Sequence, residues 1–319
     1  MKKLFISLIS LALSTSALTG QNVARECVLF EVFTGIGCPY CPAAANGIAE
    51  MLEEGCQIAP LAYHTSAFSS NEYYTTETNA RASYYGISSY PTLKADGILS
   101  VSGGGGASES MYSYYISRYN QRISMPSPFT IDIECSAPVG TEYTVTCTVN
   151  EVGTSTSSNM KVHIALSQSN IPQSWQGLET LNHVVRDMIP NQNGTAYQGG
   201  ELVITETFDM KDYPKEDCYL TAWVQDASTK EVYQAVRLSL NYPDFEHDVA
   251  IKSVSDIATH NCSGTSNAYV EVKNNGSEPI TSFDVVVYAD NNEVAREHWT
   301  GDAINFTETA FINIPTFNL

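Results

Sequence analysis

The feature that most constrains this chain is a pair of cysteines, Cys38-Pro-Tyr-Cys41, that directly follows a strongly apolar segment. The apolar segment, Val28–Phe33, is rich in Val and Phe, a composition that predicts a buried strand. Apolar residues recur at helical spacing from Cys41 to Leu52, and Gly55 is placed to end that helix. The sequence therefore predicts a strand, a tight turn, a dithiol and a helix in that order.

This order of elements favours redox chemistry at the two cysteines. It places Cys38, as the sulfur expected to face solvent, at the N-terminus of the helix, where unpaired N–H groups and the helix dipole stabilise a thiolate. Cys41 is expected one turn inside, where it closes a disulfide back onto Cys38. Half of a zinc site is a weaker interpretation, because the sequence has no second Cys-x-x-Cys and no Cys/His pair at zinc-ligand spacing. No metal and no other cofactor is expected, and a structural disulfide is the alternative to a reactive dithiol.

A second motif lies further along the chain. The segment Tyr85-Gly-Ile-Ser-Ser-Tyr90-Pro91-Thr-Leu93 resembles the part of thioredoxins in which a cis-proline loop faces the dithiol. The resemblance implies that Cys38 is the attacking thiol and Cys41 the resolving thiol. It also implies that Tyr90 and Pro91 bind a substrate chain beside them.

Two positions depart from the thioredoxin pattern. Val32 stands where thioredoxins have a buried Asp, and the neighbouring Glu31 should point to the opposite face of the strand. Pro42 removes a backbone donor in the first helical turn and is expected to loosen the start of the helix. Both departures bear on the rate of turnover.

The first residues of the chain predict export. Met1-Lys2-Lys3 precedes an apolar run, Leu4–Leu13, and small polar residues follow as far as Gly20, so residues 1–20 are expected to be a signal peptide. No other stretch is long and apolar enough to cross a bilayer as a helix. Export implies an oxidising compartment, in which the eight cysteines are able to pair. The formal charge of −19 argues against nucleic acid and anionic membranes as partners.

The pattern of the chain changes after Pro126-Ser-Pro128. Residues 22–125 mix strand and helix signals, whereas residues 127–243 carry many short segments of alternating polarity, which are typical of a β-sandwich. Residues 246–319 are again all-β but supply only about five strands, so this second sandwich is expected to be incomplete. The predicted fold class is an α/β thioredoxin-like domain followed by two all-β immunoglobulin-like sandwich domains.

Taken as a whole, the chain resembles an exported, thioredoxin-like family related to the 28-kilodalton outer-membrane protein of Gram-negative bacteria. The resemblance rests on Glu31–Gly35, on Tyr90-Pro91-Thr92, and on the run from Ile171-Pro172 to Met188. The part from Asp248 onward resembles a cell-adhesion-related bacterial domain of immunoglobulin type, through Lys273–Ser277 and Trp299–Gly301. The resemblance implies a location in the periplasm, the outer membrane or the cell surface.

Other cysteines also have predicted partners. Cys27 and Cys56 each precede a predicted strand, and adjacent parallel strands would bring the two sulfurs together in a structural disulfide. Cys135 and Cys147 share the inward side of neighbouring strands and are the second candidate pair, whereas Cys218 and Cys262 are left unassigned.

One histidine and one glycine-rich segment stand near the predicted dithiol. His64, at the end of the second strand, is the nearest titratable candidate to assist Cys38, although a structural histidine bonded to backbone is the alternative. Gly103–Gly106 has no Lys-Ser/Thr after it, so a turn is expected there in preference to a phosphate loop.

Two functions follow from these patterns. The first is an exported thiol–disulfide oxidoreductase that acts on protein disulfides and is served by a redox partner that the sequence does not identify. The second is a non-catalytic binding protein of the envelope or cell surface, in which the β-sandwich domains present surfaces and associate with the envelope. The sequence favours the first.

Overall fold

The computed structural model describes residues 21–69, 72–139, 141–155, 157–241, 247–255, 265–306 and 308–318. The predicted signal peptide, residues 1–20, lies outside these ranges. The chain divides into two compact units, Met1–Leu240 and Asn241–Leu319. Within the described ranges, no helix has both the length and the apolar character needed to cross a membrane.

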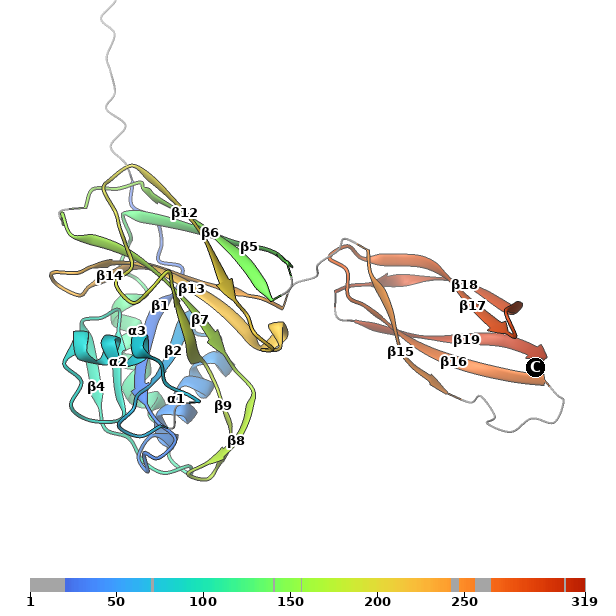
Figure 1. The fold of residues 1–319 in the computed structure, drawn as a ribbon, viewed down its shortest axis with the longest axis horizontal. Helices are drawn as coiled ribbons and strands as arrows, with labels where there is room; N and C mark the ends of the chain where they lie inside the picture. The colour runs from blue at the N-terminus through green and yellow to red at the C-terminus, as the bar shows by residue number, and fades with distance from the viewer. Residues whose placement is uncertain are drawn as a thin grey trace, which may run out of the picture. The chain divides into compact units, whose positions relative to one another are not determined.

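The first unit alternates strands and helices in its first half and is almost entirely β in its second half (Figure 1). Its helices and strands are, in chain order, β1 Val28–Thr34, α1 Pro42–Glu53, β2 Ile58–His64, α2 Thr76–Tyr85, β3 Thr92–Ala95, β4 Leu99–Ser102, α3 Tyr112–Arg122, β5 Phe129–Val139, β6 Glu142–Glu151, β7 Met160–Gln168, β8 Ile171–Trp175, β9 Leu178–Leu181, β10 Val184–Ile189, β11 Thr195–Ala196, β12 Glu201–Asp209, β13 Cys218–Asp226 and β14 Val232–Ser239.

A single nine-stranded sheet runs through both halves of this unit, in the order β14-β13-β7-β10-β2-β1-β3-β4, with β11 paired to β7. The two halves join where β10 lies parallel to β2, with Val184 opposite Ala62, and the Ala62 N–H donates to the His183 carbonyl at 2.7 Å. The remaining strands of the second half, β12, β6 and β5, form a separate three-stranded sheet.

The predicted fold class is therefore wrong. The described residues are mostly strand, with three α-helices, and the strands expected to form a separate sandwich extend the sheet that begins with β1 and β2. The physical reason is the free edge of β2, whose backbone N–H and C=O groups need a partner. That partner, β10, comes from far along the chain, and local polarity patterns carry no information about such a pairing.

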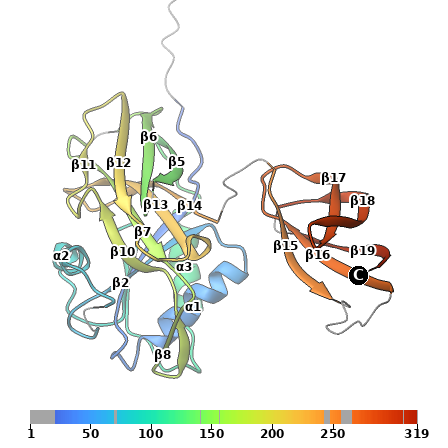
Figure 2. The same cartoon turned by 45° about the vertical axis from the view of Figure 1, so that its right-hand side comes forward.

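Both faces of the large sheet are covered, which explains why every residue of β1 is buried. On one face, Phe30 packs with Met51 of α1 and Tyr115 of α3. On the other face, Phe33 packs with Tyr85 of α2 and with Trp223 of β13 in a common core cluster. Figures 1 and 2 both show β5, β6 and β12 grouped at the opposite end of this unit from α1 and β8.

A buried carboxylate fastens the two halves together. Asp96, which follows β3, accepts hydrogen bonds from the Leu29 N–H and from the guanidinium group of Arg122 and forms an ion pair with Arg25, each at 2.9 Å. Both arginines also donate to the carbonyl of Val232 in β14, at 3.2 Å. The N-terminal segment, β1, α3 and β14 thus share one ionic centre, as expected for one cooperative unit and not for two separate domains.

The second unit is all-β. It contains β15 Val249–Ser255, β16 Thr265–Asn274, β17 Ile280–Ala289, β18 Asn292–Ile304 and β19 Thr309–Asn318. β15, β16 and β19 form a three-stranded sheet, and β17 pairs with β18. Val270, Ile304, Ile312 and Phe317 belong to the core cluster between them.

Candidate functional site

The two cysteines of the Cys-x-x-Cys motif form a disulfide in the turn that follows β1. Their Cα atoms lie 5.4 Å apart. The turn is held by backbone bonds, in which the Cys38 N–H donates to the Gly35 carbonyl at 3.0 Å and the Cys41 N–H donates to the Cys38 carbonyl at 3.2 Å. The order of strand, turn, dithiol and helix is as the sequence predicts.

The start of α1 differs from the prediction by one turn. Cys41, and not Cys38, is the N-cap residue of the helix, and Pro42 occupies the first helical position. Proline is well suited there because its missing N–H has no partner within the helix and its fixed φ is helical. Pro42 therefore starts the helix and does not loosen it.

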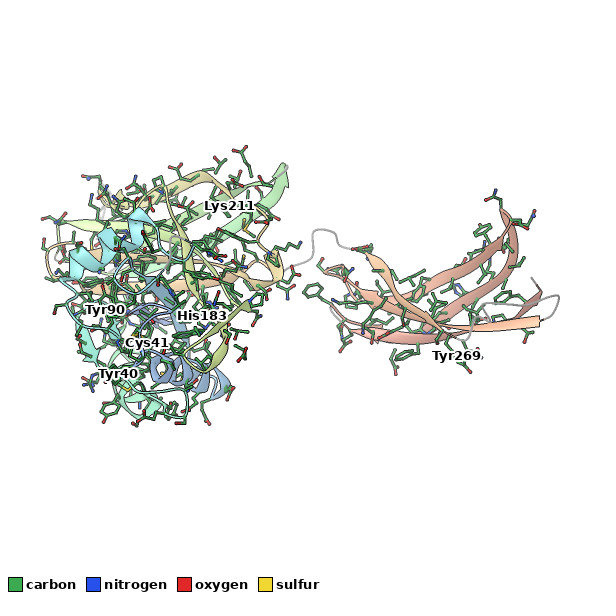
Figure 3. The ribbon with its side chains drawn as sticks, turned by 60° about the horizontal axis from the view of Figure 1, so that its bottom comes forward. Tyr40, Cys41, Tyr90, His183, Lys211 and Tyr269 are labelled. Carbon is green, nitrogen blue, oxygen red and sulfur yellow. A yellow bond between two sulfur atoms is a disulfide. The ribbon has the colours of Figure 1, made fainter. Side chains whose placement is uncertain are left out.

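The loop of Tyr90 and Pro91 lies beside the dithiol. The peptide bond between them is cis. Tyr90 packs against the apolar cluster that contains Cys38 and Cys41, and its ring meets that of Phe68 edge-on with centroids 5.3 Å apart. Figure 3 labels Tyr40, Cys41 and Tyr90 in this region. The two residues expected to bind a substrate chain are thus next to the cysteines, and Phe68 was not anticipated.

The glycine-rich segment Gly103–Gly106 also belongs to the site. The Gly103 N–H donates to the Pro91 carbonyl at 3.0 Å, and the Gly105 N–H donates to the Tyr40 carbonyl at 2.9 Å. A Cβ atom added at Gly104 would collide with the Tyr40 carbonyl and the Pro91 ring. Glycine is needed because the chain passes directly against the dithiol turn. The sequence predicts a turn here but not its neighbours.

The cysteines are covered by a hairpin from the second half of the unit. Cys38 is 1% exposed and Cys41 is fully buried, whereas Tyr40 between them is 62% exposed. The apolar cluster that contains both sulfurs also contains Tyr73, Ile171, Trp175, Leu181 and Val184. The expectation that Cys38 faces solvent is therefore wrong. The covering strands β8 and β9 lie beyond the domain boundary predicted at Pro126, and no local pattern in the sequence connects them to the dithiol.

His64 lies near the dithiol but is a neutral group. It is buried at the end of β2, and its Nδ1 lies 3.1 Å from the Ser69 hydroxyl. Desolvation, with a smaller contribution from the charge of Arg186, lowers the pKa of His64 to about 3. The ring therefore supplies no positive charge near neutral pH. It lines an apolar pocket between α1 and β2 that Trp175 and Leu181 close on the other side.

Glu31 is placed on the far face of β1, as the alternation of the strand predicts. Its carboxylate accepts from Arg81 Nε at 2.6 Å and from the Tyr85 hydroxyl at 2.6 Å. Val32, at the position where thioredoxins have an Asp, packs against α1 in the opposite cluster. No side chain of the strand supplies a carboxylate to Cys41.

The other cysteines do not form the predicted bridges. Cys27 and Cys56 are both free thiols. Cys27 packs on the α2 face of the sheet and its thiol donates to the Ala235 carbonyl at 2.9 Å, whereas Cys56 packs against the α1 face. The two side chains therefore lie on opposite faces of the sheet. Cys147 is likewise a free thiol in β6, so the predicted pairing with Cys135 is absent, and Cys262 lies outside the described residues.

Metal chemistry has no candidate site in the part of the chain that the structure describes. Within those ranges, no three His, Cys, Asp or Glu side chains are grouped so that they could hold an ion.

Comparison with known proteins gives a fold likeness. No family model and no curated protein matches this chain. Among solved structures, HBP35 of Porphyromonas gingivalis has a TM-score of 0.57 at 17% identity and covers 92% of this chain and 99% of that chain. A domain of the outer membrane lipoprotein Omp28 from Porphyromonas gingivalis has a TM-score of 0.29 at 17% identity and covers 35% and 88%.

The likeness to HBP35 shows that the two chains share a fold, and at this identity it shows the fold alone. The Omp28 domain bears the name of the family that the sequence resembles, but its TM-score is too low to carry an argument.

Proposed function

We propose that this protein is an exported thiol–disulfide oxidoreductase that acts on protein disulfides through Cys38 and Cys41. The observation that carries the proposal is the disulfide itself, closed across a turn at the start of α1 with the cis Tyr90–Pro91 loop beside it. A structural disulfide needs no such loop. The export signal read from Met1 to Gly20 supports an oxidising envelope compartment, where a dithiol of this kind has disulfide substrates.

The exchange proceeds in two steps from the reduced protein. The Cys38 thiolate attacks one sulfur of a substrate disulfide, the substrate S–S bond breaks, and the leaving sulfur takes up a proton. Cys41 then loses its proton and attacks Cys38 in the mixed disulfide, which releases the second substrate sulfur as a thiol. The substrate gains two electrons and two protons, and the Cys38–Cys41 disulfide of this structure is formed.

The chain's own groups position these steps. The backbone of the Tyr90–Pro91 loop and the exposed ring of Tyr40 flank the cysteines, so an extended substrate segment is expected to lie between them. The dipole of α1 acts on Cys41 at the N-cap and, one turn further away, on Cys38. No Lys or Arg occurs between Arg25 and Arg81 in the sequence, so neighbouring residues add no charge to help.

Trapping of mixed disulfides tests the proposal. Cys41→Ser leaves the attacking thiol but removes the resolving thiol, so mixed disulfides with envelope proteins should accumulate. The matched control, Cys38→Ser, should trap almost none. Each variant is expressed with its export signal, quenched with acid to stop exchange, alkylated after neutralisation in denaturant, and examined on non-reducing gels. Equal, background-level trapping by both variants contradicts the proposal.

One observation favours a second function, that of a non-catalytic envelope binding protein. Both sulfurs are buried under β8 and β9, as in a disulfide that only stabilises its surroundings. This alternative predicts that the Cys38–Cys41 disulfide resists dithiothreitol in the folded protein. The oxidoreductase predicts that this disulfide is reduced while the fold is intact.

A further inference from the structure

The segment that covers the dithiol is a small hairpin that is separate from the large sheet. Strands β8 and β9 pair only with each other, with Ile171 opposite Leu181 and Trp175 opposite Leu178. The hairpin continues from β7 at one end and leads into β10 at the other, so both of its ends are anchored in the large sheet. Figures 1 and 2 show it beside α1. We name residues 171–181 the covering hairpin.

The chain changes direction abruptly at both ends of the covering hairpin. Asn170 has a φ of 52° and His183 a φ of 59°, in the left-handed region that few residues other than glycine adopt. His183 is fixed to the sheet because its carbonyl accepts from the Ala62 N–H and its own N–H donates to the Ser169 hydroxyl. The base is thus held by the sheet, and Asn170 and His183 are the element-terminal positions at which a moving hairpin would absorb its change in backbone angles.

Few polar contacts hold the covering hairpin against the rest of the unit. The Tyr73 hydroxyl donates to Gln173 Oε1 at 2.8 Å, and Gln176 Nε2 donates to the Ile36 carbonyl at 3.2 Å. The indole N–H of Trp175 donates to the Thr180 carbonyl inside the hairpin itself. Trp175 would therefore keep its hydrogen bond if the hairpin moved away as a body. The remaining attachment is apolar packing, through the cluster that Ile171, Trp175 and Leu181 form with the disulfide.

This packing suits a disulfide and does not suit a thiolate. A disulfide is uncharged and packs as an apolar group, whereas a buried charge without a partner is costly. The titratable neighbours offer no compensation: burial lowers the pKa values of His64 and His183 to about 3, so both are neutral. The charge of Arg186 is directed elsewhere, because its Nε donates to Gln168 and it stacks on the rings of Tyr73 and Tyr213.

We propose that the covering hairpin is a lid whose position depends on the redox state of the dithiol, closed on the Cys38–Cys41 disulfide and released when that disulfide is reduced. The proposal rests on the proposed function, because a protein disulfide reaches Cys38 only after the hairpin has moved. It assigns a role to Trp175, the largest residue of the apolar cluster that contains both sulfurs. Oxidation by substrate then closes the lid behind the departing product.

The redox change that operates the lid is balanced by an external dithiol, which reaches the disulfide in a minor, transiently open population of the oxidised protein. That dithiol loses two electrons and two protons and becomes a disulfide, while Cys38 and Cys41 each gain one electron and one proton. Ionisation of Cys38 afterwards places a negative charge in the apolar cluster that contains Trp175. Hydration of the Cys38 thiolate is then more favourable than its burial in the closed apolar packing. The hairpin therefore opens about its base.

Hydrogen exchange in the full-length protein tests the lid without any substrate. The protein is measured oxidised and after reduction with dithiothreitol, and exchange of backbone amides is followed by mass spectrometry. Peptides covering residues 171–181 should exchange at least about tenfold faster in the reduced protein, while peptides from β7 should not change. Equal exchange of the hairpin in the two states overturns the proposal.

A variant pair provides a second measurement. Trp175→Ala removes the largest side chain of the cluster that buries the sulfurs, so dithiothreitol should reduce the Cys38–Cys41 disulfide at least about tenfold faster. Trp299→Ala, in the second unit, is the matched control and should leave the rate unchanged. An unchanged rate in Trp175→Ala counts against the lid. Cys41→Ser could fail to trap mixed disulfides while hydrogen exchange of the covering hairpin still depends on the redox state. That result would support the lid and contradict the proposed oxidoreductase activity.

Discussion

Replacement of Asp96 by Asn tests whether the first unit folds as one body. Asp96 is fully buried and joins three elements through Arg25, Arg122 and the Leu29 N–H, each at 2.9 Å. Asn keeps the shape but removes the charge, which leaves two buried guanidinium groups with only Glu231 as a carboxylate partner, 2.8 Å from Arg122. Loss of one member of a buried ionic centre typically costs about 3–5 kcal/mol. We expect the free energy of unfolding to fall by that amount.

Urea unfolding of Asp96→Asn in a Trp299→Phe background provides the assay. The chain has three tryptophans, so this background leaves Trp175 and Trp223 as fluorescent reporters of the first unit. The helical signal in far-ultraviolet circular dichroism, which comes from α1–α3 of the first unit, should be lost in a transition that coincides with the change in tryptophan fluorescence. A change below about 1 kcal/mol would refute the role assigned to Asp96. A separate transition for α1–α3 alone would refute the single cooperative unit.

Three further predictions concern the surroundings of the dithiol. The pKa values of His64 and His183 are about 3 in the folded protein and about 6.5 when unfolded, so the unfolded chain binds more protons between these values. The free energy of unfolding should fall as pH drops below about 6.5, by up to about 1.4 kcal/mol per pH unit for each histidine. Denaturant titrations at a series of pH values should show that this free energy depends less steeply on pH in His64→Gln. An equal pH dependence would contradict the neutral, buried state of His64. His64→Ala should leave the pH profile of Cys38 alkylation by iodoacetamide unchanged, because the ring is neutral; a raised midpoint would show that His64 assists. Gly104→Val forces a collision with Tyr40 and should lower the free energy of unfolding by about 1–3 kcal/mol in the same titration, whereas Gly106→Val, whose added Cβ meets only the Glu109 carboxylate at 4.0 Å, is the control for an added side chain without a collision.

The sequence predicts the local part of the site well. The strand, turn and helix around Cys38 and Cys41 depend on neighbouring residues, whose polarity and spacing are visible in the chain. The position of Pro91 likewise follows from a short motif. The sequence does not show which strand pairs with the free edge of β2, because that partner is β10 and the pairing is set by tertiary packing.

The same reason explains the misplaced cysteines. A strand reveals which residues alternate, but not which face each side chain takes beyond the strand's end. Cys27 and Cys56 flank neighbouring strands, yet they lie on opposite faces of the sheet. Cys38 is buried in a cluster with Trp175 and Leu181, which are distant in sequence; they lie in the run from Ile171 to Met188, but nothing in that run shows that it packs on the dithiol. Long-range packing, and not local propensity, decides whether the dithiol is exposed.

The reduction potential of the Cys38–Cys41 disulfide tests the central claim most directly. The full-length protein is equilibrated in defined thiol–disulfide buffers, alkylated, and analysed by mass spectrometry of the peptide that contains both cysteines. An exchanging dithiol should titrate between about −120 and −270 mV, the range of known thiol–disulfide oxidoreductases. A potential below about −300 mV, typical of structural disulfides, would contradict the proposed function.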